Sequence, residues 1–201
     1  MRLDFGPHRR GYRLAIVGMA FAAVLVIAGV ATWLFQAHSQ ASGIGGPFTL
    51  IDGLGQQVTD RSFRGRYMLV YFGFTFCPDA CPTTLNEVAE ALDQLGPKAD
   101  RVQPIFITLD PDRDTPAVIK QYVGNFSPKL IGLTGTPEQI AAVTKEYRVY
   151  RAIHRTGPGP KDYTVDHSSV LYLMGPDGRF IAPIPSESPE ALATDIAKYL
   201  S

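Results

Sequence analysis

An uncharged apolar stretch constrains this 201-residue chain more than any other feature of its sequence. Residues 14–35 contain no Asp, Glu, Lys or Arg. As a helix they would measure about 33 Å, which is enough to cross a hydrocarbon layer of roughly 30 Å. Four arginines precede the stretch, and basic residues stay on the cytoplasmic side of a membrane. We therefore expect residues 1–13 to be a cytoplasmic N-terminal tail and residues 14–35 to be a transmembrane helix that anchors the chain in the lipid bilayer.

Two other interpretations of this stretch remain open. A cleaved secretory signal normally has an apolar core of about 7–15 residues, shorter than this one, although the small residues within positions 38–42 could be cleaved. Arg9 and Arg10 are compatible with a twin-arginine export signal. All three interpretations place the rest of the chain across the membrane. In a bacterium, the uncleaved anchor predicts a single-pass protein of the cytoplasmic (inner) membrane, with its N-terminus in the cytoplasm and its soluble domain on the periplasmic side.

A short polar segment separates the anchor from the rest of the chain. Residues 36–47 are rich in Gly, Ser and Ala, which is typical of a flexible linker. Residues 48–201 suffice for one domain with an apolar core, because 45% of the chain is hydrophobic. From residue 36 onward, 15 Lys and Arg accompany 18 Asp and Glu, with no basic stripe. This charge pattern argues against nucleic acid as a partner.

Apolar patterns alternate between strand and helix through residues 48–201. Short apolar runs predict strands, while apolar residues at helical spacing and Thr-Pro caps predict helices. Strands are expected at residues 48–51, 57–59, 67–72, 102–109, 130–133, 169–174 and 179–184, with helices over 85–95 and from residues 115, 136 and 189. Because helices connect the central strands, the sheet is partly parallel, and it ends in an antiparallel hairpin. The predicted fold is α/β and thioredoxin-like, with a mixed central sheet flanked by helices.

Cys77 and Cys81, the two cysteines of the chain, lie in the turn between the strand at 67–72 and the helix that follows. A thiol at a helix N-terminus meets the positive end of the helix dipole, which lowers its pKa. Residues four apart on one helical turn lie roughly 6 Å apart, close enough for a disulfide or one shared metal ion. Two thiolates favour Cu(I) or Zn. A metal site, a redox-active dithiol and a structural pair all stay open here, although closing so short a loop stabilises little.

His167 is the candidate third ligand. It lies where residues 152–162, a Gly- and Pro-rich segment that we expect to be an exposed loop containing His154, join the next strand. Long loops in compact domains often carry function, and this one could bring His167 toward the cysteines. A core or surface histidine with no metal is the alternative. Two cysteines and one histidine suit trigonal Cu(I), whereas a closed zinc site needs a fourth ligand.

Acidic residues near these positions have simpler roles. Asp79, between the cysteines, is expected as an acid favoured in the first turn of a helix, where it could influence the charge of the thiolates or the metal. Asp166 should face away from His167, because adjacent strand residues point to opposite faces. Residues 110–116 predict a turn and a helix cap, or a surface near the site for a partner.

Three sequence blocks resemble the Sco/SenC family. They are GFTFCPDACP at residues 73–82, ITLDPDRDTP at 107–116 and VDHSSVLYLMGPDGRF at 165–180, in the family's order and spacing, and the resemblance covers residues 47–201. It implies a thioredoxin-like copper chaperone for cytochrome c oxidase assembly. By this resemblance Cys77, Cys81 and His167 are the ligands of a copper ion, as Cu(I), Cu(II) or both, and the cysteine pair can also cycle between dithiol and disulfide. The implied partners are oxidase subunit II or a related copper oxidase, and a periplasmic copper donor or thiol reductant.

Three functional hypotheses follow. In the first, the chain is a membrane-anchored metallochaperone that supports assembly of the copper centre of cytochrome c oxidase subunit II, and it is then a carrier rather than an enzyme. In the second, the chain is a periplasmic thiol–disulfide reductase in which Cys77 and Cys81 act on that subunit or another partner. A peroxidase on the same fold is a weaker third hypothesis, because two close cysteines with His167 are better explained by a metal.

Overall fold

The computed structural model describes Val26 and residues 43–200. The chain divides into two compact units, Met1–Gly43 and Ile44–Ser201. The predicted tail, the predicted anchor apart from Val26, and most of the predicted linker lie outside the described residues. Within the described residues, no helix has both the length and the apolar character that a membrane crossing needs. The folded architecture described below is that of the second unit.

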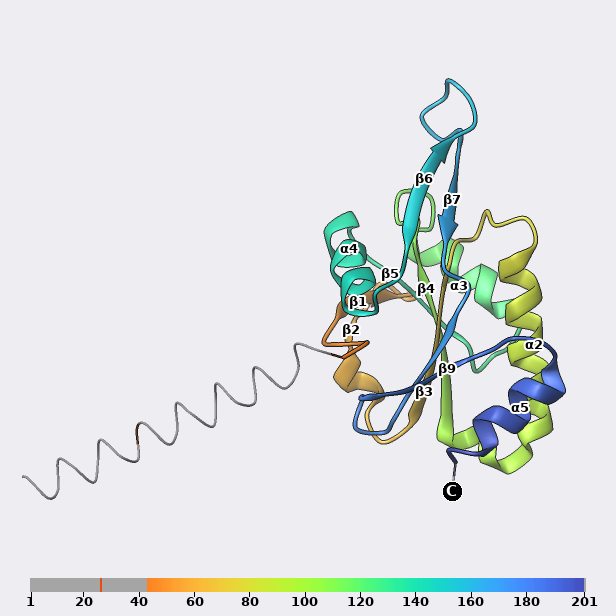
Figure 1. Ribbon diagram of the computed structural model, residues 1–201. Coiled ribbons are helices and arrows are strands. Elements are labelled where there is room, and N and C mark those ends of the chain that lie inside the picture. The colour runs from red at the N-terminus through yellow and green to blue at the C-terminus, as the bar shows by residue number, and fades with distance from the viewer. Residues whose placement is uncertain (1–25, 27–42, 201) are drawn as a thin grey trace, which may run out of the picture. The chain divides into compact units, whose positions relative to one another are not determined.

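A seven-stranded mixed sheet forms the centre of this unit, with strand order β2-β1-β5-β4-β3-β8-β9 (Figure 1). β3 pairs in parallel with β4, and β4 with β5, whereas the other neighbours are antiparallel. The prediction of a partly parallel sheet with a terminal antiparallel hairpin is therefore confirmed. The strands are β1 (Thr49–Asp52), β2 (Gln57–Thr59), β3 (Tyr67–Gly73), β4 (Val102–Thr108), β5 (Ile131–Thr134), β8 (Leu171–Met174) and β9 (Phe180–Ile184).

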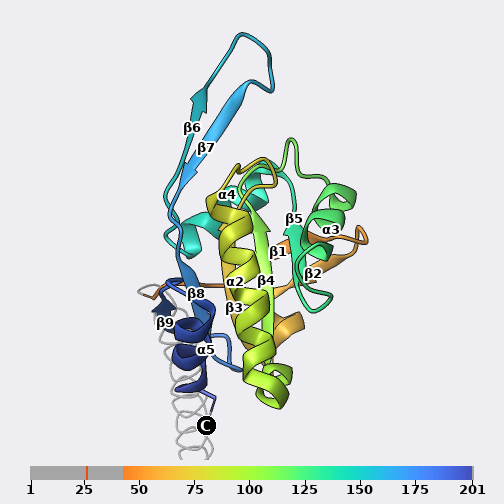
Figure 2. The same ribbon diagram turned by 90° about the vertical axis from the view of Figure 1, so that its right-hand side faces the viewer.

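Helices cover both faces of the sheet. One face packs against α2 (Ala80–Leu95), α3 (Pro116–Gly124) and α5 (Pro189–Ala197), and Figure 2 shows α2 in front of the sheet with α5 and α3 on either side. The other face packs against α4 (Pro137–Glu146) and the short 3-10 helix η1 (Asp60–Phe63). A second 3-10 helix, η2 (Gly96–Arg101), follows α2. This layered arrangement is the thioredoxin-like plan expected from the alternating strand and helix signals.

β3 supplies both cores, because side chains alternate along a strand. Leu69 and Tyr71 join the core beneath α2, while Met68, Val70 and Phe72 join the core on the opposite face. All five side chains are buried, as the continuous apolar run predicts for a central strand. The C-terminal end of β3 is thereby fixed between the two cores of this unit, and the turn that carries the cysteines begins there.

The predicted starts of α3 and α4 and the predicted end of α2 are confirmed, whereas α2 begins at Ala80, five residues before the predicted residue 85. Thr136 and Gln139 form a reciprocal capping box, with Thr136 Oγ1 accepting from the Gln139 N–H and Gln139 Oε1 accepting from the Thr136 N–H. Thr115 caps α3 by accepting from the Val118 N–H. Gly96 ends α2 with a φ of 55°, a left-handed conformation that glycine adopts without strain. Local capping chemistry therefore placed these ends correctly from the sequence.

A second, two-stranded sheet stands in place of the exposed loop that was predicted over residues 152–162. β6 (Arg151–Arg155) pairs antiparallel with β7 (Tyr163–His167), and Figure 1 shows this hairpin projecting from the body of the domain. The loop prediction is wrong for residues 152–155. Only the tip, with its Gly and Pro residues, is irregular. The two strands pair with each other rather than with the central sheet. The alternation of strands and helices that predicted the central sheet therefore gives no signal for them.

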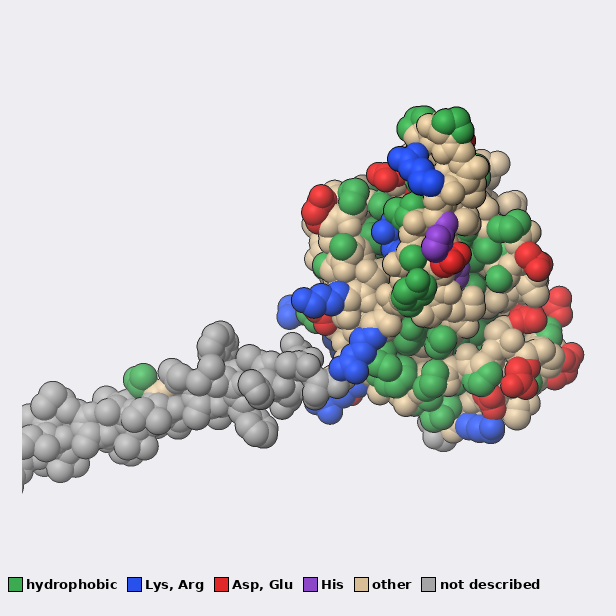
Figure 3. Space-filling model, turned by 45° about the horizontal axis from the view of Figure 1, so that its top comes forward, with side chains coloured by type: hydrophobic (Ala, Val, Ile, Leu, Met, Phe, Trp, Pro, Cys, Tyr) green, Lys and Arg blue, Asp and Glu red, His purple; other side chains and the backbone are tan. Residues whose placement is uncertain are grey.

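Charged side chains are unevenly spread over the surface. Figure 3 shows acidic side chains gathered on the side formed by α2 and α5, where Glu90, Asp93 and Glu190 are exposed. Apolar side chains occupy much of the surface near the base of the hairpin in the same view. The exposed face around the hairpin thus differs in chemistry from the acidic helical side.

Candidate metal centre

The turn between β3 and α2 holds the two cysteines side by side. Cys77 is half-buried, and its backbone N–H donates to the Phe74 carbonyl oxygen at 3.2 Å. Cys81, the second residue of α2, is fully buried, and its N–H donates to Cys77 Sγ at 3.4 Å. Both thiols are free in this structure. The start of the helix therefore presents two sulfur atoms at one point of the domain.

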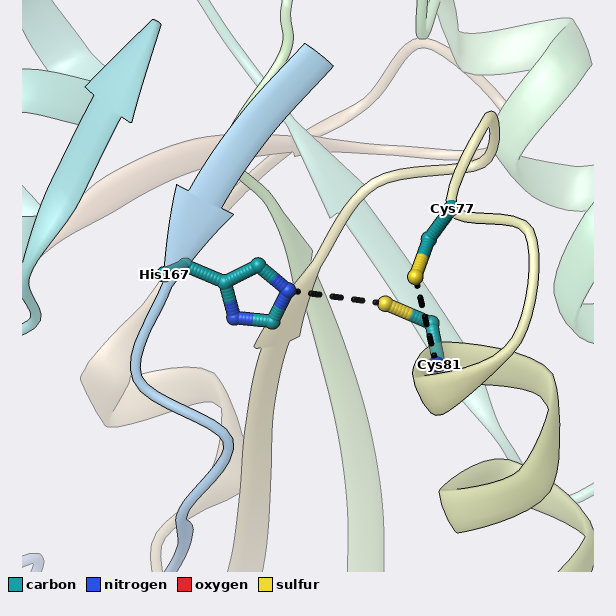
Figure 4. Close-up of side chains that lie close together, drawn as sticks. All are labelled: Cys77, Cys81 and His167. Atoms are coloured by element: carbon teal, nitrogen blue, oxygen red, sulfur yellow. Dashed lines mark hydrogen bonds between the residues drawn. The ribbon is translucent and has the colours of Figure 1, made fainter. Parts of the chain in front are cut away.

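His167 reaches this point from the end of β7, 86 residues further along the chain. Its Nε2 atom lies 3.6 Å from Cys81 Sγ, and Figure 4 shows the ring directed at that sulfur. Its Nδ1 atom lies 3.1 Å from the Ser168 carbonyl oxygen, which can only accept, so Nδ1 carries the proton in that hydrogen bond. The Tyr71 and Phe74 rings contact the imidazole in edge-on geometry. The ring is thus oriented with the lone pair of Nε2 toward the cysteines.

The ligand atoms of Cys77, Cys81 and His167 all lie within 4.8 Å of one another. Within the described residues, they are the one group of three or more His, Cys, Asp or Glu side chains close enough to share a metal ion. Two sulfurs and one imidazole nitrogen form a soft donor set with no carboxylate, and such a set suits copper better than Mg, Ca or Mn. This group is able to bind copper.

The neighbouring residues of β7 and β6 lie outside the group. Asp166 faces away from His167, as the alternation of a strand requires, and its Oδ2 lies 2.9 Å from His154 Nε2. Both of these side chains are more than half exposed. His154, the other histidine of the hairpin, therefore pairs with a surface acid rather than with the cysteines.

The thiol of Cys81 does not ionise easily before a metal arrives. Burial, reinforced by the hydrogen bond with Cys77, raises the pKa of Cys81 to about 12. The expectation that the helix N-terminus would lower the thiol pKa is therefore wrong for Cys81, because loss of solvation outweighs the helix dipole at a fully buried position. In the metal-free protein Cys81 is a thiol, and a bound metal ion must displace its proton.

Two residues of β3 shape the site and were not singled out from the sequence. The hydroxyl group of the buried Tyr71 donates to Cys81 Sγ at 3.8 Å. Gly73 approaches the same sulfur so closely that a Cβ atom at this position would lie 2.8 Å from Cys81 Sγ. A tyrosine and a glycine at the end of a buried strand are indistinguishable from ordinary core residues in the sequence. Only the path of the chain shows that both contact a ligand atom.

The acidic turn between β4 and α3 is more deeply buried than expected. Asp110, Arg113 and Asp114 are buried, so they do not form the surface for a partner that was one interpretation of residues 110–116. Asp114 accepts hydrogen bonds from the backbone N–H and the hydroxyl group of Thr75, two residues before Cys77. This turn therefore holds the cysteine turn in place through the hydrogen bonds between Asp114 and Thr75.

The site opens onto an apolar surface. Phe76, next to Cys77, is 63% exposed, and Tyr150, just before β6, and Ile153, in the middle of β6, are also largely exposed. Figure 3 shows hydrophobic side chains around the histidines in this region. Cys77 and His167 are only partly buried, so a molecule docked on this surface would reach two of the three ligand side chains.

Fold and site together define a class of protein: a thioredoxin-like domain that carries a cysteine–cysteine–histidine group suited to a soft metal ion. Comparison with known proteins agrees with this class. The family model described as SCO1/SenC matches residues 36–201. The chain belongs to the SCO1/SenC family.

Individual relatives show how close the likeness is. The human protein SCO1 homolog, mitochondrial, is 44% identical over 152 residues, which are 73% of this chain and 49% of that protein. The chain therefore spans about half the length of this curated relative. The structure of Bradyrhizobium japonicum ScoI with copper bound is 49% identical, with a TM-score of 0.73, and the match covers 78% of this chain and 99% of that chain.

A more distant relative is described by its redox chemistry. The structure of BsSco is 25% identical, with a TM-score of 0.60, and the match covers 79% of this chain and 92% of that chain. BsSco is described as a member of the Sco family of cytochrome c oxidase assembly proteins in which a disulfide switch was identified. One relative was thus solved with copper bound, and another is described by a disulfide switch.

Proposed function

We propose that this chain is a membrane-anchored copper metallochaperone that supports assembly of the copper centre of cytochrome c oxidase subunit II. The observation that carries the proposal is the convergence of Cys77, Cys81 and His167, whose ligand atoms lie within 4.8 Å of one another. A relative that is 49% identical was solved with copper bound, and another belongs to a family of cytochrome c oxidase assembly proteins.

In this proposal copper is a cargo that the three side chains hold and release. The Ser168 carbonyl oxygen fixes the imidazole so that Nε2 of His167 offers its lone pair, and Cys77 and Cys81 lose their protons when they bind the ion. Three ligands leave the ion accessible from the partly exposed side of Cys77 and His167. A partner that offers more or better-placed ligands can then take the ion by exchange.

The proposed partners and location follow from the same assignment. The copper acceptor is subunit II or a related copper oxidase, and the donor of copper or of reducing equivalents lies in the periplasm. The apolar surface around Phe76, Tyr150 and Ile153 supports a protein partner, because such patches on monomers mark docking sites. Residues 14–35, preceded by four arginines, support a single-pass anchor in the cytoplasmic membrane with the N-terminus in the cytoplasm.

A thiol–disulfide reductase is the second candidate, and the free, adjacent thiols of Cys77 and Cys81 favour it. In that reaction one cysteine would attack a partner's disulfide, and the second would close the disulfide of this chain. The partner would leave with two thiols, having gained two electrons and two protons. His167 has no necessary part in this chemistry, so it distinguishes the two candidates.

The experiment uses a soluble copper-centre domain of oxidase subunit II as acceptor. The acceptor is offered copper-free, once with its cysteines reduced and once with them oxidised, to the wild-type chain and to His167→Ala. A metallochaperone transfers copper to the reduced acceptor, and His167→Ala fails to do so. A reductase converts the oxidised acceptor to thiols equally well with or without His167. The absence of copper transfer from the wild-type chain would overturn the proposal.

A further inference from the structure

Arg113 lies buried between two segments that must meet for the metal centre to form. One segment is the turn at residues 74–77, which leads to Cys77, and the other is β7, which ends at His167. Arg113 itself belongs to neither, since it lies in the turn between β4 and α3. A buried guanidinium group at such a junction can fix the geometry of both neighbours, because its donors form a rigid planar fork.

The contacts of Arg113 with the hairpin are specific. Its Nη1 atom donates to the carbonyl oxygens of Tyr163 at 3.0 Å and Lys161 at 3.3 Å. Its Cζ atom lies 3.9 Å from the centroid of the Tyr163 ring. Asp110 completes the arrangement, because it accepts from Arg113 Nε through Oδ2 and from the Tyr163 hydroxyl through Oδ1 at 2.6 Å. The start of β7 is therefore held by both members of a buried ion pair.

The same guanidinium group packs on the cysteine turn. Its Cζ atom lies 4.7 Å from the centroid of the Phe76 ring and 6.0 Å from that of Phe74, within the range of cation–π contacts. Phe74 in turn contacts the His167 ring edge-on, with the ring centroids 6.0 Å apart. Arg113 thus lies between the aromatic residues that precede Cys77 and the tyrosine that begins the strand of His167.

We propose that Arg113, supported by Asp110, is a positioning residue for the metal centre: it fixes β7 against the cysteine turn so that His167 meets the two sulfurs. The β6–β7 hairpin forms its own two-stranded sheet, and its placement depends on bonds to the body of the domain. The inference rests on the proposed function, in which Cys77, Cys81 and His167 hold copper.

The chemistry of Arg113 fits a role in positioning β7 better than a role in stabilising the fold. Its buried Nη2 atom has no hydrogen-bond partner among the described residues. Leaving a donor unpaired is costly, and buried ion pairs often stabilise a fold no better than apolar residues would. A separate hydrogen bond, from Arg151 Nε to the Leu109 carbonyl oxygen at 2.7 Å, attaches the start of β6 to the body of the domain. The hairpin therefore stays attached when Arg113 is replaced, and the loss falls on the orientation of β7.

The test is a double-mutant cycle on the full chain, with Cu(I) affinity measured by competition with a chromophoric chelator. Arg113→Lys keeps the charge but loses the fork, and it should weaken copper binding roughly 10–100-fold, the usual effect of a residue that orients a metal ligand. In a His167→Ala background the same change should alter affinity less than about twofold, because Arg113 acts through His167. Arg64→Lys is the matched control. Arg64 forms an ion pair with the buried Asp60 near the opposite end of β3, so its replacement should leave copper affinity unchanged.

Amide hydrogen exchange in the metal-free chain gives a second readout. Arg113→Lys should speed exchange in residues 163–167 while leaving β3 and β4 protected. If Arg113→Lys does not fold, Tyr163→Phe replaces it, since it removes only the hydroxyl bond to Asp110 and should cost a few-fold in affinity.

Three results would overturn the inference: unchanged affinity in Arg113→Lys, an equal loss with and without His167, or unchanged exchange in β7. If the wild-type chain binds no copper, the proposed function fails, and hydrogen exchange alone decides whether Arg113 fixes β7.

Discussion

Cys81 is the residue at which burial and metal binding oppose each other most directly. Its side chain is fully buried, and its pKa of about 12 keeps it protonated at every physiological pH. A metal ion binds the thiolate, so binding must release this proton, and lower pH favours the competing thiol. Copper binding at the proposed site should therefore depend strongly on pH.

The affinity for Cu(I) should accordingly rise with pH. Between about pH 7 and 9, Cys81 alone contributes a roughly tenfold gain in affinity for each pH unit, because one proton leaves per ion bound. Chelator competition at several pH values, corrected for the chelator's own protonation, measures the slope. A flat profile over this range would show that Cys81 is already ionised, contrary to its burial.

Tyr71 tunes the same sulfur through its hydroxyl group, which donates to Cys81 Sγ. Tyr71→Phe should keep one copper ion per chain but shift the thiolate-to-Cu(II) absorption to lower energy, because the sulfur loses a hydrogen bond that stabilises its electrons. The free energy of unfolding should fall by about 1 kcal/mol. Tyr122→Phe is the matched control, since the buried Tyr122 hydroxyl has no hydrogen-bond partner among the described residues. Equal spectra for wild type and Tyr71→Phe would refute the role of Tyr71.

At the scale of elements, the turn between β4 and α3 determines how firmly the cysteine turn is held. Asp114 accepts from the N–H and hydroxyl of Thr75 and from the Thr108 hydroxyl. Asp114→Ala should lower the free energy of unfolding by about 3 kcal/mol, because it leaves three inward donors unpaired. Asp112→Ala, at an exposed acid of the same turn, should change it by less than about 0.5 kcal/mol. Chemical denaturation measures both, and equal effects would contradict the support assigned to Asp114.

The elements differ in how well the sequence predicts them. Strands with continuous apolar runs, such as residues 67–72, and helices with Thr-Pro caps are specified locally, and the structure has them where the pattern indicates. Residues 152–155, within β6, were predicted as part of a loop because β6 is short, largely exposed and paired only with β7. The signal that was available is the alternation in residues 163–167, where Val165 is buried and Asp166 exposed.

At the scale of the whole molecule, the site depends on contacts that no local pattern encodes. The spacing of Cys77 and Cys81 predicts that the two sulfurs share one helical turn. The meeting with His167 depends instead on the return of the hairpin to the end of β3, which the buried turn at Asp110–Asp114 supports. That turn was predicted as a cap or a surface because charged residues are seldom buried. The resemblance of three sequence blocks to a known family implied that all three residues share one metal site, which periodicity and spacing could not establish.

The most direct test of the account is a copper titration of the reduced chain beside single variants of the three ligand residues. Wild type should bind one copper ion with sulfur-to-copper absorption. Cys77→Ser, Cys81→Ser and His167→Ala should each lose more affinity than the roughly 10–100-fold that a lost supporting bond costs a metal site. His154→Ala, which removes the hairpin's other histidine, should bind as wild type does. Copper retention by Cys77→Ser equal to that of wild type would contradict the account.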